Sequence, residues 1–298
     1  MVLFYKFVPV SDPSMTMRWQ RELCARLGLK GRIIISPHGI NGTLGGDIKM
    51  LRQYKSQMNT SGIFRGIMYK WSDANGDEFP KLSVKVRPEL VAFQKPEEVK
   101  VDKHGVIGGG RRLKPKQVHE LVEKFGDDVV FFDGRNRYEA EVGRFKNSVI
   151  PEVKNTRDFP QEIKSGKYDK LKDKKVVTYC TGGVRCEILS VLMKNRGFKE
   201  VYQLDGGIVK YGEKYGDDGL WEGNLYIFDG RMNHKFSDKA KDIGSCVHCA
   251  GKTSNFENCA DVSCNRLVLI CENCRNARKI LCENHKENLI ISQRSVNV

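Results

Sequence analysis

This sequence lacks any apolar run that approaches the ~20 residues of a membrane-spanning helix. Its first ten residues, MVLFYKFVPV, alternate apolar and polar side chains, without the longer apolar stretch and small-residue cleavage site of a secretory signal. It also lacks internal repeats, low-complexity tracts and any fingerprint for flavin or NAD. We therefore expect a soluble cytoplasmic protein that starts at Met1 and has no membrane partner. Nothing in the sequence indicates an oligomeric state.

Positive charge is abundant, and its distribution is uneven. The 51 Lys and Arg residues exceed the 37 Asp and Glu residues, for a net charge of +14. Residues 1–126 hold 22 basic and 12 acidic side chains, residues 127–230 hold 18 of each, and residues 231–298 hold 11 and 7. Two basic flanks therefore enclose a neutral middle. Clustered cations attract polyanions, but on charge alone a well-solvated surface explains the pattern equally well.

The N-terminal third is expected to be a ferredoxin-like α+β domain, because its elements follow a βαββαβ order. Apolar alternation and β-branched residues predict strands at residues 2–8, 32–36, 43–44, 67–71 and 82–86. Helical spacing predicts a helix at residues 17–27 and a second one that Asp47 caps and that continues to about residue 58. Turns are expected at residues 39–42 (Gly-Ile-Asn-Gly) and 75–77 (Asn-Gly-Asp).

The middle of the chain is expected to be an α/β domain with a doubly wound parallel sheet. Residues 104–112, rich in Gly and basic side chains, predict a linking loop. Helices are then expected at residues 115–125, near 159–165 and at 187–196, and strands at 129–133, 175–179 and 200–203. Apolar strands separated by helices favour a sheet covered on both faces. We predict domains at residues 1–103, 115–230 and 231–298, with a linker at 104–114.

One cysteine combines several features of a reactive thiolate. Cys180 ends a predicted buried strand, and a six-residue loop and then a helix are expected to follow it. Gly182 and Gly183 allow several backbone N–H groups to face one anion, while the helix N-terminus and Arg185 add positive charge. These effects lower the pKa of a thiol and create a nucleophile. The alternative, an inert buried cysteine, does not account for the glycines and the arginine.

Two neighbouring residues leave alternatives open. Asp133 follows a predicted strand and could orient an arginine such as Arg185 through a bidentate ion pair, or it could be an ordinary cap or turn aspartate. Cys186 could resolve an oxidised Cys180 by forming a disulfide. It could equally be a small buried residue in the first turn of the helix, which is the interpretation that we favour.

The C-terminal segment is rich in cysteine and predicts two structural zinc sites. Short pairs of ligands supply the eight donors that two tetrahedral sites require, namely Cys246 and Cys249, Cys259 and Cys264, Cys271 and Cys274, and Cys282 and His285. The first and third pairs could share one ion and the second and fourth the other, although sequential pairing is open. His248 could replace a neighbour, and the cysteines could instead be free thiols. Arg275, Arg278 and Lys279 could contact RNA or only solvate the surface.

The motif Cys180-Thr-Gly-Gly-Val-Arg185 resembles the active-site loop of the rhodanese superfamily. The segments at residues 133–139, 143–151 and 202–208 also resemble parts of that family. The full order of domains is similar to the rhodanese-type tRNA uridine 5-hydroxylases. The local matches that carry this wider resemblance are Gly-Ile-Asn-Gly-Thr at residues 39–43, Cys-Thr-Gly-Gly-Val-Arg-Cys-Glu at 180–187 and Gly-Leu-Trp-Glu-Gly at 219–223.

This resemblance implies an oxidoreductase that uses molecular oxygen to convert the wobble uridine (position 34) of tRNA to 5-hydroxyuridine. It implies the anticodon loop as the partner and Cys180 as the essential residue. Arg185 and Asp133 would assist Cys180, and the active-site loop would comprise Thr181, Gly182, Gly183 and Val184. The thiolate could add to carbon 6 of uracil or carry oxidised or persulfidic sulfur. Rival hypotheses are a sulfurtransferase with a Cys180 persulfide and an RNA-binding module that has lost catalysis.

Overall fold

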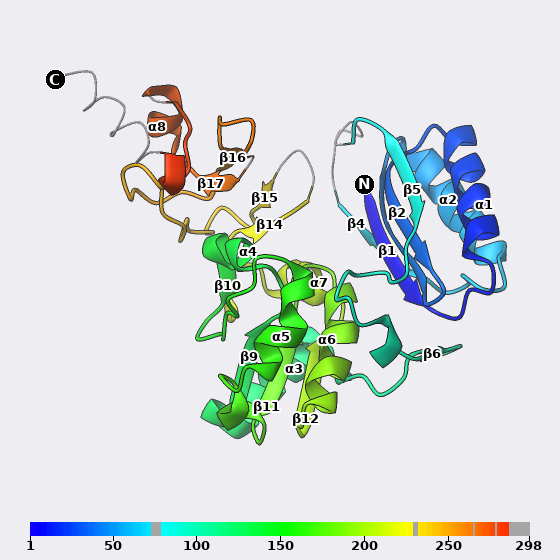
Figure 1. Ribbon diagram of the computed structural model, residues 1–298, viewed down its shortest axis with the longest axis horizontal. Helices are drawn as coiled ribbons and strands as arrows, with labels where there is room; N and C mark the ends of the chain where they lie inside the picture. The colour runs from blue at the N-terminus through cyan, green and yellow to red at the C-terminus, as the bar shows by residue number, and fades with distance from the viewer. Residues whose placement is uncertain (73–78, 229–231, 265, 278, 286–298) are drawn as a thin grey trace. The chain divides into compact units, whose positions relative to one another are not determined.

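The computed structural model describes residues 1–72, 79–228, 232–264, 266–277 and 279–285 (Figure 1). The chain divides into two compact units, one of Met1–Arg137 with Asn147–Lys214 and one of Tyr138–Lys146 with the residues from Tyr215 onward. None of the helices in the described ranges is both long and apolar enough to span a bilayer. The turn predicted at residues 75–77 lies outside the described residues.

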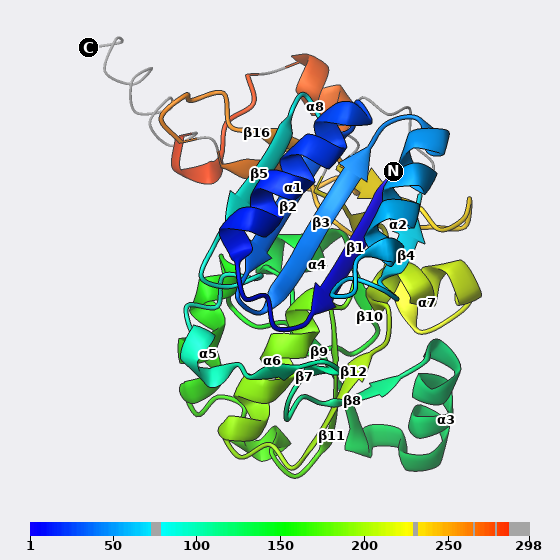
Figure 2. The same cartoon turned by 90° about the vertical axis from the view of Figure 1, so that its right-hand side faces the viewer.

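A five-stranded sheet begins the first unit, in the order β4-β1-β3-β2-β5. Only β5 runs parallel to its neighbour, β2. The strands are β1 (Val2–Phe7), β2 (Lys30–Ser36), β3 (Gly39–Gly45), β4 (Met68–Trp71) and β5 (Leu82–Val86). Helices α1 (Pro13–Arg26) and α2 (Ile48–Thr60) cover one face of this sheet (Figure 2). The ferredoxin-like prediction is confirmed, with β5 as an additional edge strand.

Aspartate N-caps determine where helices α1 and α2 begin. The Asp12 carboxylate accepts a hydrogen bond from the backbone N–H of Met15 at 2.8 Å, and Pro13 occupies the first turn. This cap makes α1 begin four residues before the predicted start, because Pro at the first helical position is already in a helical conformation. Asp47 caps α2 as predicted. The helices bury residues such as Leu23 and Tyr54 against Phe4 and Ile33 of the sheet.

The turn predicted at residues 39–42 is wrong, because these residues form the first half of strand β3. The chain reverses at Pro37 and His38 instead. The glycines serve close packing in the sheet. A Cβ on Gly42 would lie 2.7 Å from the ring of Phe4, and one on Gly39 would lie 2.0 Å from the carbonyl oxygen of Lys6. The Gly-Ile-Asn-Gly segment therefore marks close approach in a central strand here, and not a reversal.

The second sheet of this unit is four-stranded and wholly parallel, in the order β8-β12-β11-β9. Its strands are β8 (Arg111–Leu113), β9 (Val129–Asp133), β11 (Lys175–Tyr179) and β12 (Glu200–Leu204). Helices α5 (Phe159–Lys164) and α6 (Val184–Asn195) lie on one face, and α3 (Pro115–Phe125) lies on the other (Figures 1 and 2). Helix α7 (Gly207–Tyr215) follows β12. The predicted doubly wound α/β sheet is confirmed.

The segment expected to be a loop at residues 104–112 contains strand residues. A short hairpin pairs β6 (Val101–Asp102) with β7 (Gly105–Val106). Arg111 and Arg112 then pair with β12 as part of the edge strand β8. Their polar side chains concealed this strand from a search for apolar runs. Single 3-10 turns are formed by Pro96–Glu98, Gly126–Asp128, Thr156–Asp158 and Asp169–Leu171.

The other unit is built from short elements around a small apolar core. They are α4 (Arg137–Val142), the strand pairs β10 (Gly143–Phe145) with β13 (Trp221–Gly223), β14 (Leu225–Tyr226) with β15 (Asn233–His234) and β16 (Phe256–Asn258) with β17 (Leu267–Leu269), and α8 (Glu272–Ala277). Val142, Tyr226, Phe256 and Leu269 form the core. Helices α4 and α7 were not predicted, since neither shows a long helical repeat.

Candidate functional site

Cys180 lies at the carboxyl end of the parallel sheet, directly after β11. The loop that follows has only three residues, Thr181 to Gly183, because helix α6 already begins at Val184. The predicted six-residue loop is therefore corrected, because Arg185 already belongs to the first turn of the helix. Cys186 lies in the same turn and is buried, as the favoured interpretation predicted. Gly183 adopts a φ of +95°, which favours glycine and turns the chain into the helix. The Cys180 side chain is 1% exposed.

Several hydrogen-bond donors surround the Cys180 sulfur. The backbone N–H of Gly183 donates to Sγ at 3.2 Å. Burial raises the pKa of Cys180, but the Cys186 thiol, the charge of Arg185 and the backbone N–H groups of Cys186 and Arg185 together lower it from 9.0 to about 5. Burial and the adjacent sulfur raise the pKa of Cys186 well above its ordinary value. Cys180 is therefore the thiolate at neutral pH, and Cys186 is the thiol that donates to it.

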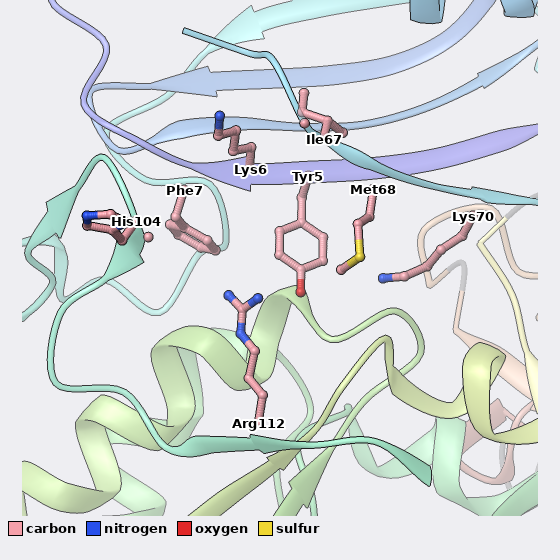
Figure 3. Close-up of a pocket in the computed structure, with 10 residues that line it drawn as sticks. Tyr5, Lys6, Phe7, Ile67, Met68, Lys70, His104 and Arg112 are labelled. Carbon is pink, nitrogen blue, oxygen red and sulfur yellow. The ribbon is translucent and has the colours of Figure 1, made fainter. Parts of the chain in front are cut away.

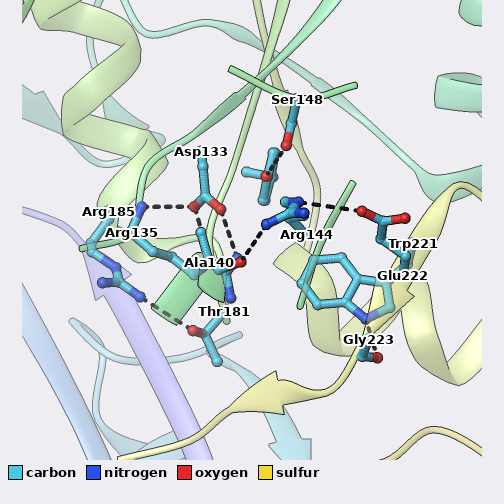
Figure 4. Close-up of polar contacts among 11 residues, drawn as sticks. Asp133, Arg135, Ala140, Arg144, Ser148, Thr181, Arg185, Trp221, Glu222 and Gly223 are labelled. Atoms are coloured by element: carbon cyan, nitrogen blue, oxygen red, sulfur yellow. Dashed lines mark hydrogen bonds and ion pairs between the residues drawn. The ribbon is translucent and has the colours of Figure 1, made fainter. Parts of the chain in front are cut away.

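Backbone hydrogen bonds from helix α7 fix the reactive loop from the opposite side. The N–H of Ile208 donates to the carbonyl of Cys180 at 2.9 Å, and the N–H of Val209 donates to that of Thr181 at 3.1 Å. A Cβ on Gly207 would lie 2.5 Å from the Cys180 carbonyl oxygen, so only glycine permits this approach. The Arg185 guanidinium donates to the Thr181 hydroxyl at 3.2 Å (Figure 4).

Asp133 forms a bidentate ion pair with Arg135. The Arg135 guanidinium donates to the two Asp133 carboxylate oxygens at 2.9 and 2.6 Å (Figure 4). Both side chains are fully buried. The pair lies next to the reactive strand, because the N–H of Gly134 donates to the carbonyl of Tyr179 at 2.8 Å. Spacing alone did not reveal which arginine Asp133 would select.

Residues of the first sheet contact the reactive loop and the start of α6. The Tyr5 hydroxyl donates to the Glu187 carboxylate at 3.1 Å. Arg112, on β8 of the second sheet, forms an ion pair with the same carboxylate at 2.5 Å. The Lys70 ammonium donates a hydrogen bond to the carbonyl of Gly182. Sequence reasoning missed these residues. The sequence of β1 contained a signal for these contacts, because the strand is apolar on both faces. Val2 and Phe4 pack under the helices of the first sheet. Tyr5 and Phe7, on the opposite face, pack with the core of the second sheet.

A cavity of about 160 Å³ adjoins these contacts (Figure 3). Tyr5 and Met68 extend from the first sheet toward Arg112 in this view. Basic and aromatic side chains dominate the lining. The lining residues are Tyr5, Lys6, Phe7, Gly66, Ile67, Met68, Lys70, His104, Gly105 and Arg112. Such a lining suits a nucleotide, because cations can contact its phosphate and flat aromatic rings can stack on its base.

The eight predicted metal ligands gather into two groups in the second unit. Cys246, Cys249, Cys271 and Cys274 form one, and Cys259, Cys264, Cys282 and His285 form the other. Within each group the ligand atoms all lie within 4.8 Å of one another, so each group could hold a metal ion. The structure thus has the interleaved arrangement and not the sequential one. His248 belongs to neither group, Arg275 pairs with Glu257 at 2.8 Å, and Arg278 lies outside the described residues.

We predict that replacing Cys186 by alanine raises the pKa of Cys180 by about one unit or more, because the thiolate loses a hydrogen-bond donor. The rate of Cys180 alkylation, read by peptide mass spectrometry, reports this pKa because only the thiolate reacts. The wild-type rate should fall by half near pH 5, and that of Cys186→Ala at a higher pH. Cys186→Ser keeps a donor and should resemble the wild type. Equal midpoints for all three proteins would contradict the proposed hydrogen bond.

Three family models match successive parts of this chain. A model described as a UPF0176 acylphosphatase like domain matches residues 1–90. A rhodanese-like domain matches residues 114–214, and a rhodanase C-terminal model matches residues 222–286. The reactive loop and both metal-ligand groups lie within the second and third matches respectively.

Curated relatives match the chain over nearly its whole length. A tRNA uridine(34) hydroxylase of Corynebacterium urealyticum is 57% identical over 281 residues, which cover 94% of this chain and 95% of the relative. A protein of the same name from Corynebacterium jeikeium is 60% identical, with 92% and 88% covered. One from Corynebacterium diphtheriae is 59% identical, with 92% and 89% covered.

Proposed function

The chain belongs to the tRNA uridine(34) hydroxylase family, and from that premise we propose that it hydroxylates carbon 5 of the wobble uridine of tRNA. The observation that carries the proposal within this molecule is the Cys180 thiolate, which backbone donors and Arg185 hold at the edge of the sheet. A nucleophile prepared in this way is needed for covalent activation of a base. Molecular oxygen is the proposed oxidant: one of its atoms becomes the hydroxyl on carbon 5 and the other leaves as water, and the two further electrons and two protons that this step requires come from an external reductant.

We assign the chemical roles as follows. The Cys180 sulfur acts on the base in one of two ways. It adds to carbon 6 of uracil, which makes carbon 5 nucleophilic, and leaves as thiolate when the hydroxylated carbon 5 loses its proton, or it carries an oxidised sulfur. The Arg185 charge and the backbone N–H groups of Gly183, Arg185 and Cys186 stabilise negative charge on that sulfur. Asp133 is a positioning residue that acts through Arg135. Because Cys180 is buried, the side chains that cover the loop must move before a base can reach it.

The proposed substrate is the anticodon loop of a cytoplasmic tRNA. Unpaired bases in such loops can leave the stack and enter an active site. Residues 1–126 carry 22 basic against 12 acidic side chains, a surplus that favours contact with phosphates. The cavity beside the reactive loop adds Lys6 and Arg112 to the rings of Tyr5 and Phe7. A sulfurtransferase acting on a small donor would need neither feature, so we regard that activity as the weaker candidate.

The two ligand groups are proposed to hold one structural zinc ion each. Four sulfur donors, or three with one imidazole, are the sets that closed tetrahedral zinc sites use. Each ion would tie segments far apart in sequence in a unit with little apolar core. We also propose domain limits at residues 1–103, 115–230 and 231–298, with a connecting segment at 104–114 whose residues 111–113 form strand β8 of the second sheet. The three family-model matches support this division.

We predict that deleting the encoding gene removes 5-hydroxyuridine and its derivatives from cellular tRNA. The wild-type gene should restore them, whereas Cys180→Ser should restore less than about 1%, because a hydroxyl is not ionised at neutral pH. Nucleoside mass spectrometry makes the measurement. Cys24→Ala is a matched control, since Cys24 is also buried but lies on α1 in the first sheet's core. Normal modification in the deletion strain would refute the proposed function.

We predict two zinc ions per purified chain, one for each ligand group. Cys249→Ser and Cys264→Ser should each lower the content to about one, because they alter different groups. The double variant should contain almost none. Elemental analysis measures the content. If one substitution removed both ions, the groups would not be independent, and a metal-free wild type would refute the assignment.

A further inference from the structure

The peptide bond between Gly182 and Gly183 is engaged at both of its polar ends. Its N–H group, on Gly183, donates to the Cys180 sulfur at 3.2 Å. Its carbonyl oxygen, on Gly182, accepts a hydrogen bond from the Lys70 ammonium. The peptide is planar and trans, so its N–H and C=O groups point in opposite directions. A lysine and a thiolate therefore stand at the two ends of one peptide dipole.

The two glycines make this peptide easy to misorient. Without a Cβ on either side, rotation of the peptide plane meets little steric resistance. A flipped peptide would aim its carbonyl oxygen at the thiolate, where two negative groups repel each other. The reactive loop therefore needs a contact from outside that fixes the peptide with its N–H group toward sulfur. Lys70, on strand β4 of the first sheet, makes that contact.

Lys70 is held in place although burial of a charge is unfavourable. Its side chain is 5% exposed, and its ammonium lies 4.8 Å from the centroid of the Tyr5 ring, a cation–π distance. Leu3, also on β1, would lie 3.1 Å from a Cβ on Gly182, so the first sheet packs directly on the loop. The hydrogen bond to the Gly182 carbonyl offsets part of the cost of burying the Lys70 ammonium.

We propose that Lys70 is a positioning residue of the active site: it orients and polarises the Gly182–Gly183 peptide so that its N–H group stabilises the Cys180 thiolate. Hydrogen bonds in such a chain strengthen one another. The acylphosphatase-like domain would then supply part of the catalytic apparatus and not only a surface for RNA. The importance for turnover rests on the proposed function, whereas the effect on the thiol is independent of it.

The charged groups that face Lys70 decide the pH range in which it acts. Burial lowers the pKa of Lys70 to about 8, and Lys210 lowers it too, while Cys180, Asp205 and Glu187 raise it. Glu187 is itself paired with Arg112 and hydrogen-bonded to Tyr5, and the charge of Arg185 acts on the Cys180 sulfur. Lys70 is therefore mainly charged below pH 8 and thiolate is present above about pH 5, so both charges coexist between these values.

The direct test is the pH profile of Cys180 alkylation in Lys70→Met, which fills the same space without charge or donor. We expect the midpoint to rise by about one pH unit. Lys70→Gln retains an N–H donor and should shift it less. Lys55→Met is the matched control, because Lys55 also lies over a β4 ring, that of Tyr69, at 5.7 Å, but does not contact the loop. An unchanged midpoint in folded Lys70→Met would overturn the proposal.

A measurement on the wild-type protein covers the case in which Lys70→Met does not fold. In protein labelled with 13C and 15N glycine, the Gly183 amide signal should titrate near pH 5 with Cys180, and the Gly182 carbonyl carbon near pH 8 with Lys70. Gly62, in an exposed turn, should show neither transition. A Gly182 carbonyl that is insensitive near pH 8 would overturn the proposal. Neither experiment contains tRNA, so a failure of the hydroxylation assay would not affect the outcome.

Discussion

A negative sulfur buried beneath the molecular surface is the feature on which the rest of this site depends. Burial alone would make Cys180 a neutral, unreactive thiol. The fold reverses that effect by bringing backbone N–H groups, the Cys186 thiol and the Arg185 charge to one atom. These groups come from two local features of the chain, the glycine turn and the first turn of helix α6. The glycines permit the turn, and the start of α6 presents backbone N–H groups to the sulfur.

The first sheet takes part in this arrangement instead of standing apart from it. Its strand β1 is apolar on both faces, so one face packs under α1 and α2 while the other packs on the parallel sheet. That second contact places Lys70 at the Gly182 carbonyl and Tyr5 at Glu187. A domain that contributes basic charge for RNA can thus also tune the reactive sulfur. Substrate binding and thiolate reactivity would then be linked through the same few side chains.

Features encoded by local sequence were predictable, and features created by packing were not. The apolar strands β9 and β11 and the Pro-started helix α3 have their predicted bounds, and the short ligand pairs identified both metal-ligand groups. The Gly-rich segment at residues 39–42 was misassigned as a turn. Its glycines are required by the close approach of the Phe4 ring and the Lys6 carbonyl, and not by a chain reversal. The partner of Asp133 and the approach of Lys70 depend on contacts between distant residues. No local pattern encodes them.

The central claim is that Cys180 is ionised in the folded protein at neutral pH. It is tested most directly by absorbance at 240 nm, where thiolates absorb, as the difference between wild type and Cys180→Ser across pH. The difference removes the contribution of the eight cysteines other than Cys180 and Cys186. The pKa of Cys186 depends on Cys180, and it lies well above the ordinary value in the wild type, so a transition in the acidic range belongs to Cys180. The account predicts a single transition with a midpoint near pH 5. A transition near pH 9, the range of an ordinary thiol, would contradict it.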